Sequence, residues 1–224
     1  MPATAWWDTA LPGGFLRGTS PGAQVIRDWS GGHHHAFQVT AAKQGAISRL
    51  GPGGQITVTS DPGAPTGWLV GGATFGAGTD YTVVVGIASI SLPSAGNTCA
   101  FTQVFVDAAH YGGLGLFNSG VDVFVSVLNF GVNSPSSLVA LTGIHSYAYV
   151  CDGAAGTAWC YLDGVKAAAT VLYTPIALTT KLNIGADTVV YSPPNGAYVR
   201  ASVWMSKLTD AQVAQAAAWS TGVP

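Results

Sequence analysis

Hydrophobic and polar positions alternate most regularly in the last third of the chain, between Ile144 and Trp219. In the run from 198 to 205, Val199, Ala201, Val203 and Met205 alternate with Tyr198, Arg200, Ser202 and Trp204. Because successive side chains of a strand point to opposite faces, this period of two predicts a half-buried β-strand.

Turn signals upstream of this run predict hairpins. Two β-prone runs within Tyr147–Leu162 flank Gly153 and Gly156, and glycine tolerates the positive φ of tight connections. The dipeptide Asp163-Gly164 favours a primed hairpin turn. A further short strand is expected at Leu182–Gly185.

The segment Leu208-Thr-Asp-Ala-Gln-Val213 predicts the start of a helix. Thr209 suits the N-cap position, and Gln212 is placed to hydrogen-bond back to it as in a capping box. Leu208 is expected to pack on Val213 as a hydrophobic staple.

Earlier runs rich in β-branched and aromatic residues predict more strands, and no helical period precedes Leu208. These runs are Gln55–Thr59, Tyr81–Ile87, Cys99–Val106 and Val121–Phe130. Regularly spaced strands and turns of this kind predict an all-β fold, a two-sheet antiparallel β-sandwich or jelly roll with one short C-terminal helix.

Three motifs, in this order, resemble the laminin-G-like, concanavalin-A-like lectin/glucanase superfamily. They are Arg27-Asp-Trp-Ser-Gly-Gly-His33, Tyr161-Leu-Asp-Gly-Val165 and Leu208-Thr-Asp-Ala-Gln212. The resemblance implies a sandwich of two antiparallel sheets, but it implies no activity, because this superfamily contains lectins, hydrolases, lyases and structural modules. We expect one lectin-like domain over residues 25–224, preceded by an arm of residues 1–24.

Composition narrows the function. Only 8% of the 224 residues are charged, and the net charge of −2 comes without a basic stripe, so the sequence does not favour nucleic-acid binding. All ten acidic residues are aspartates. The paired glutamates used by the polysaccharide hydrolases of the superfamily are therefore absent, which favours a protein that is not an enzyme, although an aspartate pair can serve in hydrolysis.

The arm carries the aromatic residues Trp6, Trp7 and Phe15. Such residues favour packing, either on the arm's own sandwich or at an interface with a neighbouring subunit.

Cysteine and histidine leave alternatives open. Cys151 and Cys160 flank the predicted hairpin turn, where they form either a disulfide or two buried thiols. The run His33-His-His35 either contributes to a metal site or belongs to a structural loop, since alternate residues of a strand point to opposite sides.

Loop aspartates and exposed aromatic rings suggest ligands. Lectin-like sandwiches often bind Ca²⁺ through loop oxygens, which makes Asp152, Asp163 and Asp187 candidate ligands. Sugars stack on exposed aromatic rings, and the candidate platforms are Trp29, Trp68, Trp159 and Tyr191.

Three functions follow from these features. The first is a structural module of a virion, a capsid-decoration or tail-associated protein of a bacteriophage, assembled in the host cytoplasm with copies of itself or other virion proteins and adhering to glycans. The second is a lectin or adhesin of a cell surface, and the third is a polysaccharide-cleaving enzyme. No secretory signal or membrane-spanning segment is visible in the sequence.

Overall fold

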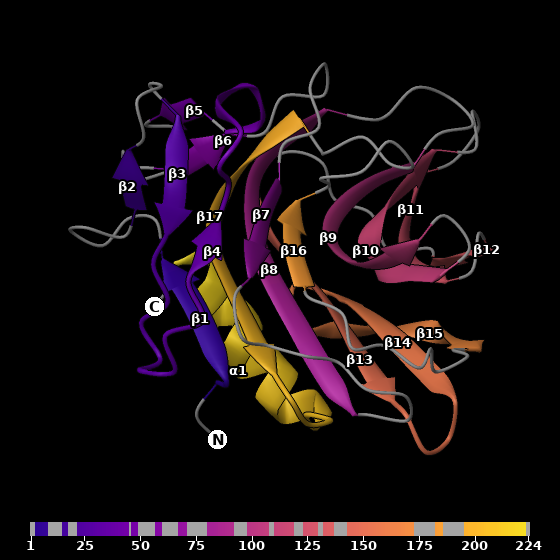
Figure 1. Ribbon diagram of the computed structural model, residues 1–224. Helices are drawn as coiled ribbons and strands as arrows, with labels where there is room; N and C mark the ends of the chain where they lie inside the picture. The colour runs from indigo at the N-terminus through magenta and orange to yellow at the C-terminus, as the bar shows by residue number, and fades with distance from the viewer. Residues whose placement is uncertain are drawn as a thin grey trace.

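The structure is a computed structural model that describes residues 3–8, 15–17, 22–44, 46–48, 57–59, 67–70, 80–91, 98–107, 110–118, 123–129, 132–136, 143–172, 182–185 and 195–222. In these ranges the chain forms two antiparallel β-sheets and one C-terminal α-helix, α1 (Asp210–Thr221), with a single 3-10 turn, η1 (Ala41–Lys43) (Figure 1). The all-β sandwich predicted from the sequence is confirmed.

The first sheet has eight strands. Their order across the sheet is β15 (Val165–Leu172), β14 (Thr157–Leu162), β13 (Ile144–Asp152), β8 (Tyr81–Ser91), β17 (Asn195–Trp204), β6 (Thr57–Thr59) and β5 (Ala46–Ser48), and β1 (Ala5–Asp8) also pairs with β17. The long strand β8 therefore lies between β13 and β17 at the centre of the sheet.

The second sheet has nine strands. Their order is β12 (Val132–Ser136), β11 (Val123–Asn129), β10 (His110–Asn118), β9 (Thr98–Asp107), β16 (Leu182–Gly185), β7 (Gly67–Val70), β4 (Ala36–Phe37), β3 (Ala23–Ile26) and β2 (Phe15–Arg17). The two sheets contact each other where β10, β11 and β12 meet β13, β14 and β15.

Helix α1 packs on the outer face of the first sheet, against β8, β13 and β17 (Figure 1). Val84, Ala148 and Trp204 share a buried cluster with Leu208 and Val213 at the start of the helix. The strand predicted at 198–205 is confirmed as β17, but the prediction that it is half-buried is wrong. The alternation of apolar and polar residues predicts that one face of β17 is exposed. Helix α1 covers that face, so both faces are buried.

The predicted turn and helix start are confirmed. Asp163 and Gly164 both have positive φ, 50° and 78°, which is the backbone of a type I′ turn, and they join Leu162 to its partner Val165. The Thr209 side chain accepts a hydrogen bond from the Gln212 backbone N–H while Oε1 of Gln212 accepts from the Thr209 N–H, so the capping box is complete.

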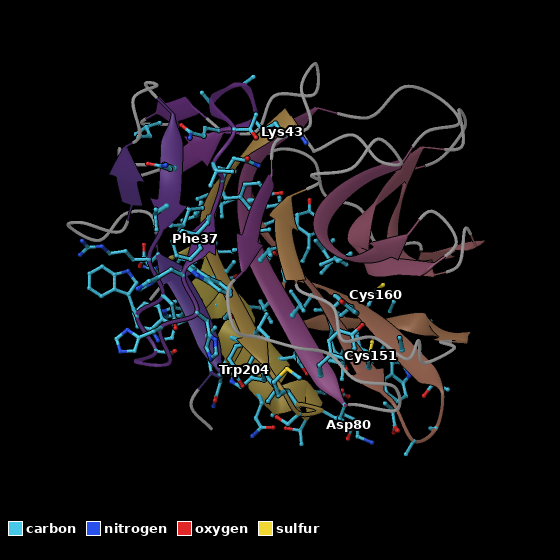
Figure 2. The ribbon with its side chains drawn as sticks, in the orientation of Figure 1. Phe37, Lys43, Asp80, Cys151, Cys160 and Trp204 are labelled. Carbon is cyan, nitrogen blue, oxygen red and sulfur yellow. The ribbon has the colours of Figure 1, made fainter. Side chains whose placement is uncertain are left out.

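The hairpin between β13 and β14 has a register that separates its cysteines. Cys151 is opposite Ala158, and Cys160 is opposite Tyr149. The two cysteines are labelled in Figure 2. Both thiols are free and buried, so the disulfide alternative is wrong and the alternative of buried thiols is confirmed. Burial raises the pKa of Cys151 and raises that of Cys160 to about 12, which keeps both thiols protonated.

Asp28 organises the loop that carries the first motif. Its carboxylate accepts hydrogen bonds from the backbone N–H groups of Trp6 at 3.1 Å, Ser30 at 2.8 Å and His34 at 2.8 Å, and from the Ser30 hydroxyl at 2.8 Å. Burial alone would raise the pKa of Asp28, but these donors together hold it below its usual value. One carboxylate thus fixes the loop against β1.

Gly86 on β8 allows α1 to lie close to the sheet. A Cβ at this position would lie 2.0 Å from the backbone oxygen of Ser220, a contact that only a backbone shift relieves. We expect Gly86→Ala to lower the free energy of unfolding by about 3 kcal/mol or more, clearly above the ~1–2 kcal/mol that a left-handed backbone costs a residue other than glycine. Urea denaturation checks this result, with Gly31→Ala as the control.

Gly31 has a φ of 86° and open space around its Cβ, so its substitution costs only backbone strain. Equal losses of stability in Gly86→Ala and Gly31→Ala would contradict the close helix contact.

Within the described ranges, no helix is long and apolar enough to cross a membrane.

Candidate functional site

The two tryptophans of β1 have different environments. Trp7 is buried with 2% of its surface exposed, and its Nε1 donates a hydrogen bond to the His34 carbonyl at 3.1 Å. Trp6, on the opposite side of the strand, is half-buried and stacks on Trp29 with ring centroids 6.5 Å apart. The Trp6 ring also meets the edge of Trp219 on α1 at 5.5 Å.

Trp6 and Trp219 form part of a cleft between the strands β1 and β17 and the helix α1. We call it the tryptophan cleft, and its volume is about 260 Å³. Its lining consists of Ala3, Trp6, Ser202, Trp204, Leu208, Gln212, Gln215, Ala216 and Trp219. Three of the seven tryptophans of the chain therefore meet at one cleft.

Polar groups accompany the aromatic rings. Oε1 of Gln212 accepts two hydrogen bonds from Thr209, one from its N–H at 2.9 Å and one from its hydroxyl at 3.0 Å, which leaves the Gln212 NH₂ group as a donor. Gln215 is exposed on the next turn of the helix. The Ser202 hydroxyl is buried and finds no hydrogen-bond partner among the described residues. A buried polar atom of this kind points to a bound water or ligand hydroxyl.

Arg200 holds one wall of the cleft in place. Its Nε donates to the Asp8 carboxylate at 2.7 Å, and its Nη1 donates to the Trp219 carbonyl at 2.5 Å. The guanidinium carbon also lies 5.3 Å from the centre of the Trp219 ring. One side chain thus joins β1, β17 and the end of α1.

Of the four predicted sugar platforms, the structure describes the side chains of Trp29 and Trp159, which belong to different parts of the molecule. Trp29 is 36% exposed and extends the cleft's aromatic surface through Trp6. Trp159 is half-buried on β14, with Nζ of Lys166 4.5 Å above its ring. The side chain of Trp68, on β7, and the whole of Tyr191 lie outside the described residues.

The predicted interface residues of the arm lie on two strands. Trp6 lines the cleft, Trp7 is buried inside the sandwich, and β1 pairs with β17 of the same chain. Phe15 is paired with Ile26, but its side chain is outside the described part.

The described candidate metal ligands are held by protein donors. Oδ1 of Asp152 accepts from the Ala155 N–H at 2.8 Å and Oδ2 from Lys207, which holds the pKa of Asp152 below its usual value. Asp163 accepts from the Ser146 N–H at 2.8 Å and pairs with Nδ1 of His145 at 2.7 Å.

The described residues contain no group of three or more histidine, cysteine or acidic side chains suited to a metal ion. Within the histidine run, Nδ1 of His35 accepts from the Asp28 N–H at 3.0 Å, and the rings of His33 and His35 meet edge to face. Asp187 lies outside the described residues, so a calcium site that uses it stays a prediction.

Sequence reasoning missed Trp204, Trp219 and the two glutamines of the cleft. A signal was present, because Gln212, Gln215, Ala216 and Trp219 are spaced i, i+3, i+4 and i+7 and therefore share one face of α1. That face meets Trp6 only through the pairing of β1 with β17, a contact between the two ends of the chain.

The fold is a two-sheet antiparallel β-sandwich, and solved structures of the same fold come from several proteins. Trypanosoma rangeli sialidase matches 94% of this chain with 12% identity and a TM-score of 0.62. The binding domain of Paraclostridial mosquitocidal protein 1 matches 90% with 11% identity and a TM-score of 0.63. Domain 4 of AbnA, an extracellular arabinanase of Geobacillus stearothermophilus solved in complex with arabinotriose, matches 96% with 12% identity and a TM-score of 0.62.

Coverage differs among these structures. The chain spans 31% of the sialidase and 50% of the mosquitocidal protein structure, but 98% of the arabinanase domain. At these identities the likeness shows the fold alone. A scan against protein-family models and a search of curated proteins found no match.

Proposed function

We propose that this protein is a non-catalytic, lectin-like module that binds a neutral carbohydrate in the tryptophan cleft. The observation that carries the proposal is the meeting of three tryptophans, two glutamines and an unpartnered buried hydroxyl in one cleft. Sugars present an apolar C–H face and a rim of hydroxyls. Indole rings suit the first, and amide and hydroxyl groups suit the second.

The size of the cleft fits a small ligand. Its volume of about 260 Å³ lies just below the usual range of roughly 300–1,000 Å³ for small-molecule pockets. The cleft therefore suits about one sugar ring. Trp29, stacked on Trp6 at the exposed end, offers a surface for a second ring of the same chain.

The arabinanase domain supports this proposal by analogy, because it has the same fold over its whole length and was solved with arabinotriose. The chain itself offers little for hydrolysis. It has no glutamate, and the carboxylates of Asp8, Asp28 and Asp210 are each engaged by donors of the protein.

Replacing Trp219 with alanine is expected to weaken sugar binding at least about tenfold, because the ring supplies one wall of the cleft. A glycan array would identify a neutral ligand, and titration calorimetry would measure the affinity. Gln215→Ala, an exposed change that leaves the fold intact, is expected to weaken binding several-fold through the loss of one hydrogen bond.

Phe37→Ala is the matched control, because Phe37 is an exposed aromatic residue that does not line this cleft. Unchanged affinity in both cleft variants, or an equal loss in the control, would contradict the assignment. Release of reducing ends from the bound glycan would contradict the non-catalytic part.

The setting of this module is a separate proposal: a capsid-decoration or tail-associated protein of a virion, rather than a cell-surface adhesin. The supporting observation is a charge-poor chain with large apolar side chains exposed at Trp29, Phe37, Val39 and Val165. A stable symmetric oligomer in light scattering is the expected result, and a monomer that resists association would count against it.

A further inference from the structure

A second cavity lies on the other side of the start of α1, against the hairpin of β14 and β15. It has a volume of about 380 Å³, and its polar and aromatic lining consists of Trp159, Tyr161, Lys166, Lys207, Thr209 and Asp210. Leu208 lines both this cavity and the tryptophan cleft, so the two sites are neighbours on the helix side of the first sheet. We call the second site the lysine cavity.

Two of the four lysines of the chain line this one cavity. Nζ of Lys166 lies 4.5 Å from the centre of the Trp159 ring and 5.9 Å from that of Tyr161. Its ion pair with Asp210 is long, at 3.4 Å, and the two side chains are 36% and 65% exposed. In a chain with 8% charged residues, two ammonium groups line one aromatic cavity together with the carboxylate of Asp210.

The ion pairs of these lysines leave them able to bind an anion. Lys207 is 44% exposed, and its partner Asp152 lies on the hairpin next to the cavity rather than in its lining. The partly exposed Lys166–Asp210 pair contributes only about 0–1 kcal/mol, so a ligand carboxylate can replace it at little cost. Lys207 keeps its contact with Asp152, whose side chain is 13% exposed, and can donate another of its three N–H groups to the ligand.

Asp210 offers the complementary chemistry. Its Oδ1 accepts the Tyr161 hydroxyl at 2.7 Å and the long contact from Lys166, while Oδ2 has no hydrogen-bond partner among the described residues. Burial and the adjacent Asp210 raise the pKa of Tyr161, so the phenol remains the donor. The carboxylate therefore keeps one oxygen to accept hydrogen bonds from ligand hydroxyls.

We propose that the lysine cavity binds an acidic sugar, a uronic acid residue whose carboxylate meets Lys166 and Lys207 while its hydroxyls meet Asp210 and its ring lies beside Trp159. Only a ligand that carries both an anionic group and hydroxyls can bind the two lysines and the Asp210 carboxylate together. The proposal rests on the proposed carbohydrate-binding function, which it extends to a second site and a charged ligand.

Titration calorimetry with an oligogalacturonate and with its carboxyl-reduced counterpart tests the proposal. We expect the acidic chain to bind at least about tenfold tighter than the reduced one, and its affinity to fall at high salt. Lys166→Met and Lys207→Met are each expected to weaken binding about tenfold, and the Lys→Arg variants are expected to retain most of it.

Lys43→Met is the control, because it removes the same charge from η1, far from the lysine cavity. Figure 2 shows Lys43 at the opposite end of the molecule from Asp80. Asp80 marks the end near the cavity, since its Oδ1 accepts a hydrogen bond from the Gly153 N–H on the hairpin that carries Asp152. Lys43→Met is expected to leave binding unchanged. Equal affinity for the acidic and reduced chains, no effect of the two lysine variants, or tighter binding of a sulfated chain would overturn the proposal.

The proposals for the two sites can be refuted independently of each other. Trp219→Ala is expected to abolish binding of the neutral ligand while the acidic chain still binds. If no neutral sugar binds but the acidic chain does, with the lysine dependence described, the tryptophan cleft has been misassigned and the lysine cavity has not.

Discussion

Replacing Arg200 with methionine is expected to lower the free energy of unfolding by about 3–5 kcal/mol, because it leaves the Asp8 carboxylate buried without its guanidinium partner. Asp8 is only 3% exposed and the two side chains meet at 2.7 Å. The same change removes the hydrogen bond to the Trp219 carbonyl, which holds the end of α1 near β17. Urea denaturation followed by tryptophan fluorescence measures the loss.

A double-mutant cycle separates the charge from the packing. Asp8→Asn removes the buried charge, so Arg200→Met should cost clearly less in that background than in the wild type. Arg200→Lys keeps a positive charge but not the two-pronged geometry, and an intermediate loss is expected. Strictly additive effects of the Asp8 and Arg200 changes would contradict a coupled buried pair.

Replacing Asp28 with alanine is expected to cost about 2–4 kcal/mol of unfolding free energy, because the donors on Trp6, Ser30 and His34 lose their common acceptor. The loop also anchors β1, so the affinity of the tryptophan cleft should fall with the stability. Thermal unfolding and calorimetry measure the two effects. Ser30→Ala removes the hydroxyl, with its contacts to Asp28, the Thr4 carbonyl and the Gly32 N–H, but leaves the carboxylate and its three backbone donors, so it should cost less.

The pKa of Asp28 gives this prediction a pH dependence. The folded value lies below the unfolded value of about 3.9, so the ionised carboxylate favours the folded state. Its contribution is fully present above the unfolded pKa and is lost as the pH falls through the folded pKa. The stability difference between the wild type and Asp28→Asn should thus be constant near neutral pH and shrink below about pH 4. A difference that grows on acidification would contradict this assignment.

The two proposed sites share one structural support. Leu208 lines both cavities, and the capping box places Gln212 beside one and Asp210 beside the other. A change that loosens the first turn of α1, such as Thr209→Ala, therefore affects both sites together, whereas Trp219 and Lys166 each belong to one.

Local features were predictable because their causes are local. The Asp163-Gly164 turn follows from two residues that tolerate positive φ, and the helix start follows from Thr209 and Gln212. The hairpin register was not predictable from the cysteine spacing, because a disulfide needs Cys151 and Cys160 to face each other. The four-residue turn between Asp152 and Thr157 instead places Cys151 opposite Ala158.

The sequence by itself determined the all-β class, the main hairpin turn, the capped helix and the shortage of charge, since each depends on composition or on neighbours a few residues apart. Only the tertiary structure decided that α1 covers the outer face of β17, that Asp8 meets Arg200 from 192 positions away, and that Trp6 meets Trp219. Residue patterns record which face of an element is apolar but not which element covers it. Both proposed binding sites lie where distant elements meet. The sequence therefore named single members, Trp159 and Trp6, as candidates, and only the structure identified the residues that surround them.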